Sequence, residues 1–276
     1  MVDAATVPVR IGPVPVGGGA PLVLIAGPCA IEDEAHALRT AERLVRMTGE
    51  AKVPFVYKSS YDKANRSSLP SYRGPGLREG LRILARVRDA TGCPVLSDVH
   101  LPDEVPAAAE ILDCLQVPAF LCRQTDLVVA CGRSGRPVNV KKGQFMAPWD
   151  MGNVVEKLRA SGCRAVTLTE RGATFGYNNL VVDLRALAIM RGFGTPVVFD
   201  ATHAVQLPGG EGTRSGGERR YVAGLARAAV AFGVDALFME VHEDPDRAPS
   251  DGATMLPLAE LPRLLDEVQA IREALR

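Results

Sequence analysis

The 276-residue sequence lacks an excess of charge of either sign, since 32 lysine and arginine residues balance 32 aspartate and glutamate residues. A neutral chain has no general electrostatic attraction to nucleic acid or to an anionic membrane. The sequence also has no apolar run approaching the roughly 18 residues of a membrane-spanning helix. Its first residues lack the charged start and the long apolar centre of a signal peptide. We therefore expect a cytoplasmic protein that binds neither nucleic acid nor a membrane.

Paired cysteines and a central linker are also missing. The six cysteines are scattered without a CxxC pair, and in a reducing compartment most cysteines are small buried hydrophobes. No stretch rich in proline, glycine and serine divides the chain near its middle. The sequence thus predicts one domain over residues 1–276, with an apolar fraction of 47% that is enough for a large core.

Short β-branched runs alternate with segments whose apolar residues recur at helical spacing. The predicted strands are Leu22–Ala26, Phe55–Lys58, Val95–Val99, Cys114–Val117, Val138–Lys141, Ala165–Thr169, Val197–Asp200 and Ala236–Glu240. The predicted helices are Glu34–Met47, Gly76–Ala90, Asp103–Leu112, Leu127–Gly132, Asn153–Ser161, Asp183–Met190, Glu218–Phe232 and Leu258–Leu275. Strand–helix alternation favours a parallel sheet, and eight repeats favour closure into a (β/α)₈ TIM barrel.

Residues 1–20 precede the first predicted strand. They contain VPVRIGPVPVG, which is typical of a two-stranded hairpin. We expect this short N-terminal β-hairpin to plug the bottom of the barrel.

Polar residues gather after the predicted strands rather than before them. Examples are AGPC after the first strand, KSSYDKANRSS after the second, SDVH after the third and DATH after the seventh. Barrel enzymes place their chemistry at the carboxyl ends of the strands, on residues from several strands. This placement predicts an enzyme, without naming a reaction.

One group of these residues has the character of a metal site. Strands one, seven and eight are neighbours in a closed barrel, and they are followed by Cys29, His203, Glu240 and Asp251. A thiolate, an imidazole and two carboxylates suit a divalent transition metal such as Zn, Fe, Mn or Co. The alternative is a core thiol beside a hydrogen-bonded histidine. His242 is a rival ligand that we expect past the strand end, and His36 is expected on a helix surface.

A second group is cationic. Lys58, Lys63, Lys141 and Arg171 come from three strand ends, and converging cations need a counter-charge. A phosphorylated or carboxylated substrate would supply it; salt bridges to Asp62, Asp98 and Glu170 are the alternative. Lys141 and Lys142 are adjacent on a strand and point to opposite sides, so only one, here taken as Lys141, faces the pocket.

Arg66, Ser67 and Ser68 lie several residues beyond their strand. They could meet a second phosphate or a neighbouring subunit, or form a solvated loop.

The longest of these motifs together resemble one family. AGPCAIE, YKSSYDKANRSS, LSDVH, LQVPAFLCRQTDL, NVKKGQFMAPWD, LTERGATFGYNNLVVD, DATHAVQLPGG and FMEVHEDPDRAPSDG are similar to 3-deoxy-D-manno-octulosonate 8-phosphate synthase, over about residues 22 to 275. The resemblance implies a (β/α)₈ barrel, usually a homotetramer. It implies a transferase that condenses phosphoenolpyruvate with D-arabinose 5-phosphate and water for lipopolysaccharide biosynthesis. The cysteine in AGPC implies the metal-dependent form, with Cys29, His203, Glu240 and Asp251 as ligands.

The resemblance also assigns substrate contacts residue by residue. Lys63, Lys141, Arg171 and Gln116 match the positions around phosphoenolpyruvate, and Lys58 matches a lysine near both substrates. Asn65 and Asp98 match contacts to the sugar, and Arg66 and Ser67 match residues that reach the sugar phosphate across a subunit boundary. The expected catalytic residues are Lys58, Lys63, Asp98, His203 and Asp251.

Two other functions are compatible with the pattern. One is 3-deoxy-D-arabino-heptulosonate 7-phosphate synthase, which takes erythrose 4-phosphate, although KANRSS argues against it. The other is a non-catalytic barrel that binds a phosphorylated ligand, against which the complete set of ligands and cations argues.

Overall fold

The barrel predicted from the sequence is present in the computed structural model, which describes residues 6–210 and 215–275. Its eight parallel strands are β3 (Val23–Gly27), β4 (Phe55–Lys58), β5 (Val95–Asp98), β6 (Cys114–Val117), β7 (Val138–Lys141), β8 (Val166–Glu170), β11 (Val197–Asp200) and β14 (Ala236–His242). They pair in the order β11-β8-β7-β6-β5-β4-β3-β14, and β14 also pairs with β11. This last pairing closes the sheet, which confirms the (β/α)₈ fold.

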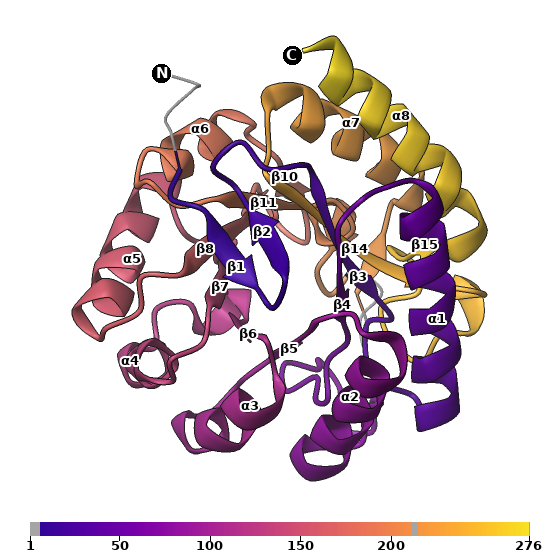
Figure 1. Cartoon of the computed structure of the whole chain (residues 1–276), viewed down its shortest axis with the longest axis horizontal. Helices are drawn as coiled ribbons and strands as arrows, with labels where there is room; N and C mark the ends of the chain where they lie inside the picture. Colours follow the sequence, from indigo (N-terminus) through magenta and orange to yellow (C-terminus); the bar gives the residue numbers. More distant parts are fainter. Residues whose placement is uncertain (1–5, 211–214, 276) are drawn as a thin grey trace.

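The helices form a ring around these strands (Figure 1). They are α1 (Glu34–Glu50), α2 (Leu77–Thr91), α3 (Val105–Ile111), α4 (Thr125–Arg133), α5 (Met151–Ala160), α6 (Arg185–Arg191), α7 (Val222–Phe232) and α8 (Leu261–Ala274). The Asp33 carboxylate accepts a 2.7 Å hydrogen bond from the His36 N–H at the start of α1, which satisfies a backbone donor of the first turn. None of these described helices combines the length and the apolar run that a membrane span requires.

The N-terminal hairpin pairs β1 (Val9–Ile11) with β2 (Val14–Val16), so that Val9 lies opposite Val16. It lies across one end of the barrel, in front of the strands in Figure 1. Its buried side chains pack on apolar residues that point into the barrel, among them Val23, Ile25 and Phe238. The hairpin therefore closes the amino end of the barrel; residues 1–5 of the predicted extension lie outside the described residues.

Shorter elements, which the sequence did not predict, lie in the loops that follow the barrel strands. The strands are β9 (Ala173–Thr174), β10 (Leu180–Val181), β12 (Gln206–Leu207), β13 (Gly216–Gly217) and β15 (Leu256–Pro257). The 3₁₀-helices are Pro102–Glu104, Ala119–Leu121, Pro148–Asp150, His203–Val205, Arg219–Tyr221, Pro245–Arg247 and Leu258–Glu260. They fix the paths of the loops that follow the barrel strands.

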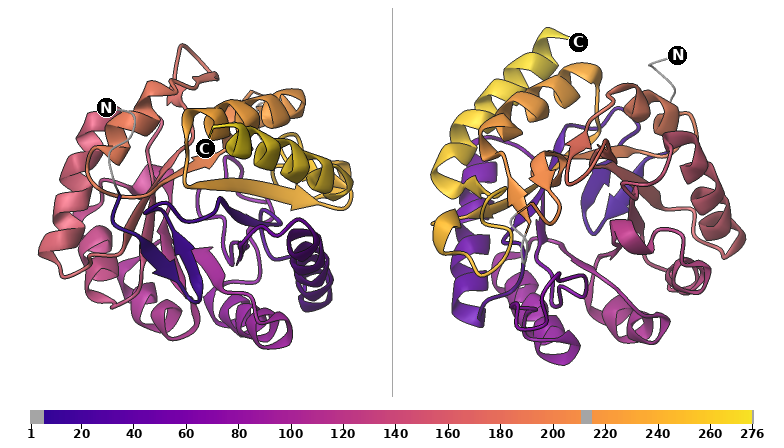
Figure 2. Two further views of the ribbon diagram at one scale, coloured as in Figure 1. Left: turned by 45° about the horizontal axis from the view of Figure 1, so that its top comes forward. Right: turned by 180° about the vertical axis from the view of Figure 1, so that it is seen from behind.

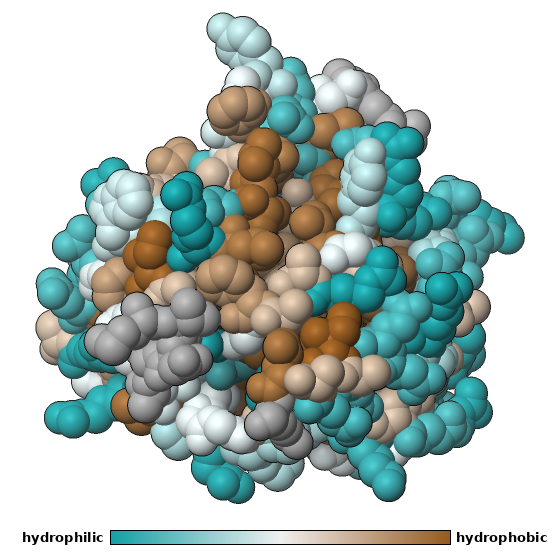
Figure 3. Space-filling view, turned by 90° about the horizontal axis from the view of Figure 1, so that it is seen from above, coloured by the Kyte–Doolittle hydropathy of each residue, from teal (hydrophilic) through white to brown (hydrophobic). Residues whose placement is uncertain are grey.

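The main core lies between the barrel and the helices, where the outward-facing strand residues meet the buried faces of the helices. The opposite faces of the helices carry charged residues. The face of the molecule in Figure 3 shows hydrophilic residues around a central band of apolar ones. Packing on both faces of the sheet is the usual arrangement for parallel strands.

Candidate active site

A pocket opens at the carboxyl ends of the strands, the end of the barrel seen from behind in Figure 2. Most residues predicted for substrate binding or catalysis line it: Lys58, Lys63, Asn65, Arg66, Ser67, Asp98, Lys141, Arg171, His203 and Asp251. They come from several strand ends and the loops that follow them. The structure thus brings residues that lie far apart in the sequence to one cavity.

The predicted metal ligands meet at one side of this pocket. One donor atom each from Cys29, Glu240 and Asp251 lie within 4.8 Å of one another. The Cys29 Sγ donates to Asp251 Oδ2 over 3.1 Å, and His203 Nε2 lies 3.6 Å from Glu240 Oε1. The described residues therefore include a group of donors that could hold a metal ion.

Three observations fit a cation in this group. Burial raises the pKa of the Cys29 thiol, and the nearby carboxylates add to the effect, so its sulfur keeps a proton that a bound metal would displace. Glu240 Oε2 is buried and makes no hydrogen bond within the described residues, although buried carboxylate oxygens are normally satisfied. Sulfur, nitrogen and carboxylate donors together favour a transition metal over Mg²⁺ or Ca²⁺.

Asp200 orients the imidazole of His203. Its Oδ2 lies 2.7 Å from His203 Nδ1, and its Oδ1 accepts the His203 N–H over 2.9 Å. Burial lowers the pKa of His203, an effect that Asp200 opposes. The neutral ring with its proton on Nδ1 leaves the Nε2 lone pair directed at Glu240, as in the carboxylate–histidine pairs of metal sites.

The same carboxylate holds a lysine. Lys141 Nζ donates to Asp200 Oδ2 over 2.6 Å and lies 3.9 Å from the centroid of the Phe238 ring. Burial lowers the pKa of Lys141, although Asp200 acts in the opposite direction. Lys142 is directed away from this network, and its ammonium donates to the backbone oxygens of Gly143 and Gly172.

Two more lysines pair with buried carboxylates. Lys58 Nζ lies 3.4 Å from both Asp98 Oδ2 and Glu240 Oε1, and Lys63 Nζ lies 3.2 Å from the same Glu240 oxygen. Burial acts to raise the pKa of Asp98, but Lys58 and Lys63 outweigh it and hold that pKa well below its usual range. One of the salt bridges considered as an alternative, Lys58 with Asp98, therefore exists, whereas Lys63 pairs with Glu240, and both lysines line the pocket.

Arg66 and Arg171 complete the cationic lining. Arg66 Nη2 lies 3.3 Å from Asp251 Oδ2 of its own chain. Arg171 is buried; its Nη2 donates to Gln206 Oε1 over 2.9 Å, and its Nη1 makes no hydrogen bond among the residues described. Arg171 lines the pocket, and a guanidinium nitrogen without a protein partner is suited to bind an anionic oxygen.

Among the residues predicted to contact a substrate, Gln116 does not line the pocket. Its side chain is fully buried beneath Asp98, to which its amide nitrogen donates over 2.6 Å. Its amide oxygen accepts from Asn139 over 2.8 Å. Its contact with phosphoenolpyruvate stays a prediction.

Sequence reasoning missed residues that hold the predicted ones in place. Asp200 is the clearest case, and Ser60, which donates to Asp98 and accepts from Lys58 over 2.8 Å, is another. Asp200 ends β11, and Ser60 lies two residues beyond β4. Position at a strand end was a signal that could have identified both.

Two histidines lie elsewhere than expected. His36 is 4% exposed and is therefore not on the surface of its helix. Strand β14 continues to His242, which pairs with Pro257 of β15. The prediction that this residue lies past the strand end was wrong, because β15 extends the sheet there.

Comparison with known proteins agrees with this geometry. The model of the DAHP synthetase I family matches residues 6–276. A protein of Trichlorobacter lovleyi is 61% identical over 96% of this chain and 98% of its own length. One of Geobacter sulfurreducens is 62% identical over 95% of this chain and 97% of its own. Both are named 2-dehydro-3-deoxyphosphooctonate aldolase, which confirms the resemblance, and the chain belongs to the DAHP synthetase I family.

Proposed function

We propose that this protein condenses phosphoenolpyruvate with D-arabinose 5-phosphate and water. The products are 3-deoxy-D-manno-octulosonate 8-phosphate and inorganic phosphate, and the aldolase name of the relatives denotes this synthase. The observation that carries the proposal is the identity of about 60% over nearly the whole chain to proteins of that name. The sugar product enters lipopolysaccharide biosynthesis.

The cationic lining supports binding of these substrates. Phosphoenolpyruvate carries a phosphate and a carboxylate, and the sugar carries a second phosphate. We assign Lys63, Lys141 and Arg171, which line the pocket, to phosphoenolpyruvate, and Arg66 and Ser67 to the sugar phosphate. Fixed cations that hold two anionic molecules face to face lower the entropic part of the barrier.

We infer that Cys29, His203, Glu240 and Asp251 hold a divalent transition metal, one of Zn, Fe, Mn and Co. Support comes from the donor set and from the unsatisfied Glu240 Oε2. When bound, such a metal acts as a Lewis acid that polarises an oxygen atom.

The reaction forms a bond between C3 of phosphoenolpyruvate and the aldehyde carbon, adds water at C2 and releases phosphate. Negative charge develops on the aldehyde oxygen, and the ammonium of Lys58 or Lys63 can stabilise it. Asp98 is ionised and lies beside Lys58, so it can orient a sugar hydroxyl. We assign the proton acceptor for the attacking water to Asp251, whose carboxylate faces both Cys29 and Arg66.

The assembly and the location are also proposals. We propose a cytoplasmic homotetramer of single-domain subunits, in which Arg66 leaves its contact with Asp251 of the same chain and, together with Ser67, reaches a neighbouring active site. The tetramer is tested by measuring the mass of the protein in solution. The shared site is tested by mixing Arg66→Ala subunits with Lys63→Ala subunits and measuring activity. Activity recovered in the mixed oligomers requires a site shared between subunits.

The reaction is tested by measuring phosphate release from phosphoenolpyruvate, with arabinose 5-phosphate and erythrose 4-phosphate compared side by side. We expect release with the five-carbon sugar phosphate. Preference for erythrose 4-phosphate would identify the heptulosonate synthase instead, and no release with either sugar in the presence of Mn²⁺ would indicate a non-catalytic binding protein.

The metal is tested by exhaustive treatment with EDTA and by Cys29→Asn. We expect EDTA to abolish activity and added Mn²⁺ or Zn²⁺ to restore it. Cys29→Asn should keep the circular dichroism spectrum while its bound metal falls. Full activity after chelation would exclude metal dependence.

A further inference from the structure

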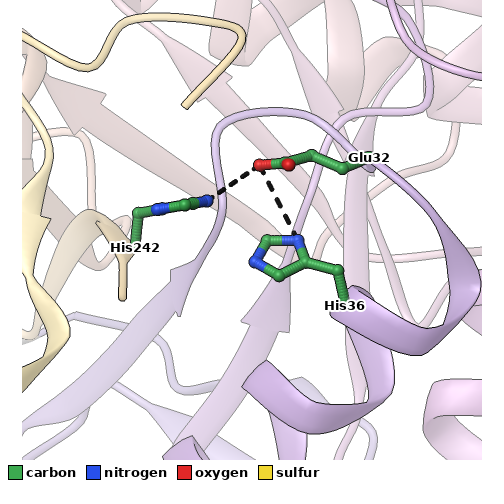
Figure 4. Close-up of side chains that lie close together, drawn as sticks. All are labelled: Glu32, His36 and His242. Atoms are coloured by element: carbon green, nitrogen blue, oxygen red, sulfur yellow. Dashed lines mark hydrogen bonds and ion pairs between the residues drawn. The ribbon is translucent and has the colours of Figure 1, made fainter. Parts of the chain in front are cut away.

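A second group of metal-binding residues lies outside the pocket. Glu32 follows β3, His36 lies in the first turn of α1, and His242 ends β14 (Figure 4). One oxygen of Glu32, Oε1, lies 2.9 Å from His242 Nε2 and 3.7 Å from His36 Nδ1. One donor atom from each of the three residues lies within 4.8 Å of the other two.

His36 has an unusual environment. Its ring is buried, yet neither ring nitrogen makes a hydrogen bond with any residue in 6–210 or 215–275. The nearest carboxylate oxygens belong to Glu32, at 3.7 Å from Nδ1, and Glu243, at 3.5 Å from Nε2. Burial of an imidazole without a partner is costly, so the ring geometry points to a missing partner between these residues.

We propose that Glu32, His36 and His242 form a second binding site for a divalent transition metal, with Zn²⁺ as the representative ion. Two imidazoles and one carboxylate are the ligand set of many zinc sites, in which a fourth position remains open. Nitrogen donors select Zn²⁺, Co²⁺ or Ni²⁺ over Mg²⁺ and Ca²⁺. The site is independent of the proposed reaction.

The outer contacts of His36 favour this arrangement. Its Nε2 faces Glu243, so a proton there is directed at a carboxylate and the Nδ1 lone pair is left facing Glu32. Metal-binding histidines commonly pair their other nitrogen with a carboxylate in this way. The carboxylate of Asp33, which caps α1, offsets the positive end of the helix dipole near the ion.

His242 must change its tautomer to bind. At present its Nδ1 accepts the Asp244 N–H over 2.9 Å, so the proton lies on Nε2 and is directed at Glu32. Coordination through Nε2 moves this proton to Nδ1, and the Asp244 N–H, on an exposed residue, turns to water. The loss of one hydrogen bond predicts weaker binding here than at the Cys29 group.

An ion at this site would connect the first and last units of the barrel. Strand β14 pairs with β3, and Glu32 and His36 follow β3 directly. Three ligands would fix the start of α1 against the end of β14. We therefore expect this metal to affect stability more than turnover.

The test is equilibrium dialysis of the full chain against Zn²⁺ alone, followed by elemental analysis. The unaltered protein should retain one more Zn²⁺ per chain than His36→Gln, which keeps a polar side chain of similar size. Glu32→Gln, at a half-buried position, should lose the same equivalent and serves if His36→Gln does not fold. Glu42→Gln makes the same exchange at an exposed position of α1 and should retain the full amount.

Co²⁺ separates the two sites. The Cys29 group should give a sulfur-to-cobalt charge-transfer band, which the second group lacks because it has no sulfur. His36→Gln should keep that band and lose one equivalent of Co²⁺. Equal metal content in all variants would overturn the proposal. Loss of the band in His36→Gln would also overturn it, because the substitution would then have disturbed the Cys29 group.

Discussion

The buried carboxylate of Asp200 offers the sharpest test of the site's electrostatics. Its side chain is 0% exposed and is shared between the ammonium of Lys141, at 2.6 Å, and the ring of His203, at 2.7 Å. Asp200→Asn keeps the shape of the side chain and removes its charge. The Lys141 ammonium then stays buried without its hydrogen-bonded counter-ion, so the variant should be much less stable.

The magnitude follows from the geometry. Coulomb's law with an effective dielectric constant of about 20 gives on the order of 6 kcal/mol for unit charges 2.6 Å apart. Part of this is recovered as water and neighbouring groups reorganise, and loss of one partner of a buried pair typically costs about 3–5 kcal/mol. A chain of 276 residues has an unfolding entropy of about 0.6 kcal/mol/K. We therefore expect the melting temperature to fall by roughly 5–9 °C.

The assay is thermal unfolding followed by circular dichroism, with metal removed from all samples. Asp183→Asn is the matched control, because Asp183 pairs with Arg185 at 2.9 Å but the arginine side chain is 82% exposed. Such surface pairs contribute about 0–1 kcal/mol. Adding Lys141→Met to Asp200→Asn should recover part of the loss. Equal losses in Asp183→Asn and Asp200→Asn, or no recovery in the double variant, would refute the reasoning.

Two further predictions concern the backbone and the pH dependence. Gly27→Ala should lower the melting temperature strongly, because the new Cβ would lie 2.0 Å from the backbone oxygen of Lys58. Gly49→Ala, in α1, should raise the melting temperature slightly, because its Cβ would meet no atom within 4 Å. The expected gain in the free energy of unfolding is about 0.5–1 kcal/mol. Glu104→Gln should destabilise the protein at pH 7 but have less effect below pH 4, as measured by urea unfolding at both pH values.

The sign of the last prediction follows from the contacts of Glu104. Burial acts to raise its pKa, but hydrogen bonds from His100 and Tyr61 outweigh this and hold it at about 2. Its unfolded value is about 4.3. The stabilisation is therefore complete above the unfolded pKa and is lost as the pH falls towards the folded pKa. Glu110→Gln, at an exposed position, should show no such trend, and a loss that is equal at both pH values would contradict this explanation.

The barrel was predictable because its signal is local. The predicted limits Phe55–Lys58, Cys114–Val117, Val138–Lys141 and Val197–Asp200 agree with β4, β6, β7 and β11. Each is a short apolar run between turn residues, and the pattern needs no knowledge of its neighbours. The helix limits agree less well: α7 begins at Val222 rather than Glu218, because Arg219–Tyr221 adopts a 3₁₀ turn.

The site was predictable where residues end strands, and less so where burial depends on distant segments. Lys58, Asp98 and Lys141 reach the pocket because the ends of parallel strands meet at one rim. The burial of His36 was not predicted, because the residue that packs against its ring, His242, belongs to β14 and lies far away in sequence. Its spacing of four and eight residues from Thr40 and Leu44, both buried, was a signal for the inner face of α1.

The hairpin that packs into the amino end of the barrel has a consequence for how substrates enter and products leave. A cylinder stopped at one end has its mouth at the other, so both substrates and both products must use the same passage. We therefore expect the molecule that occupies the deepest part of the cavity to enter before its partner and to leave after it. Ordered entry and exit are thus a prediction from the closed end of the barrel.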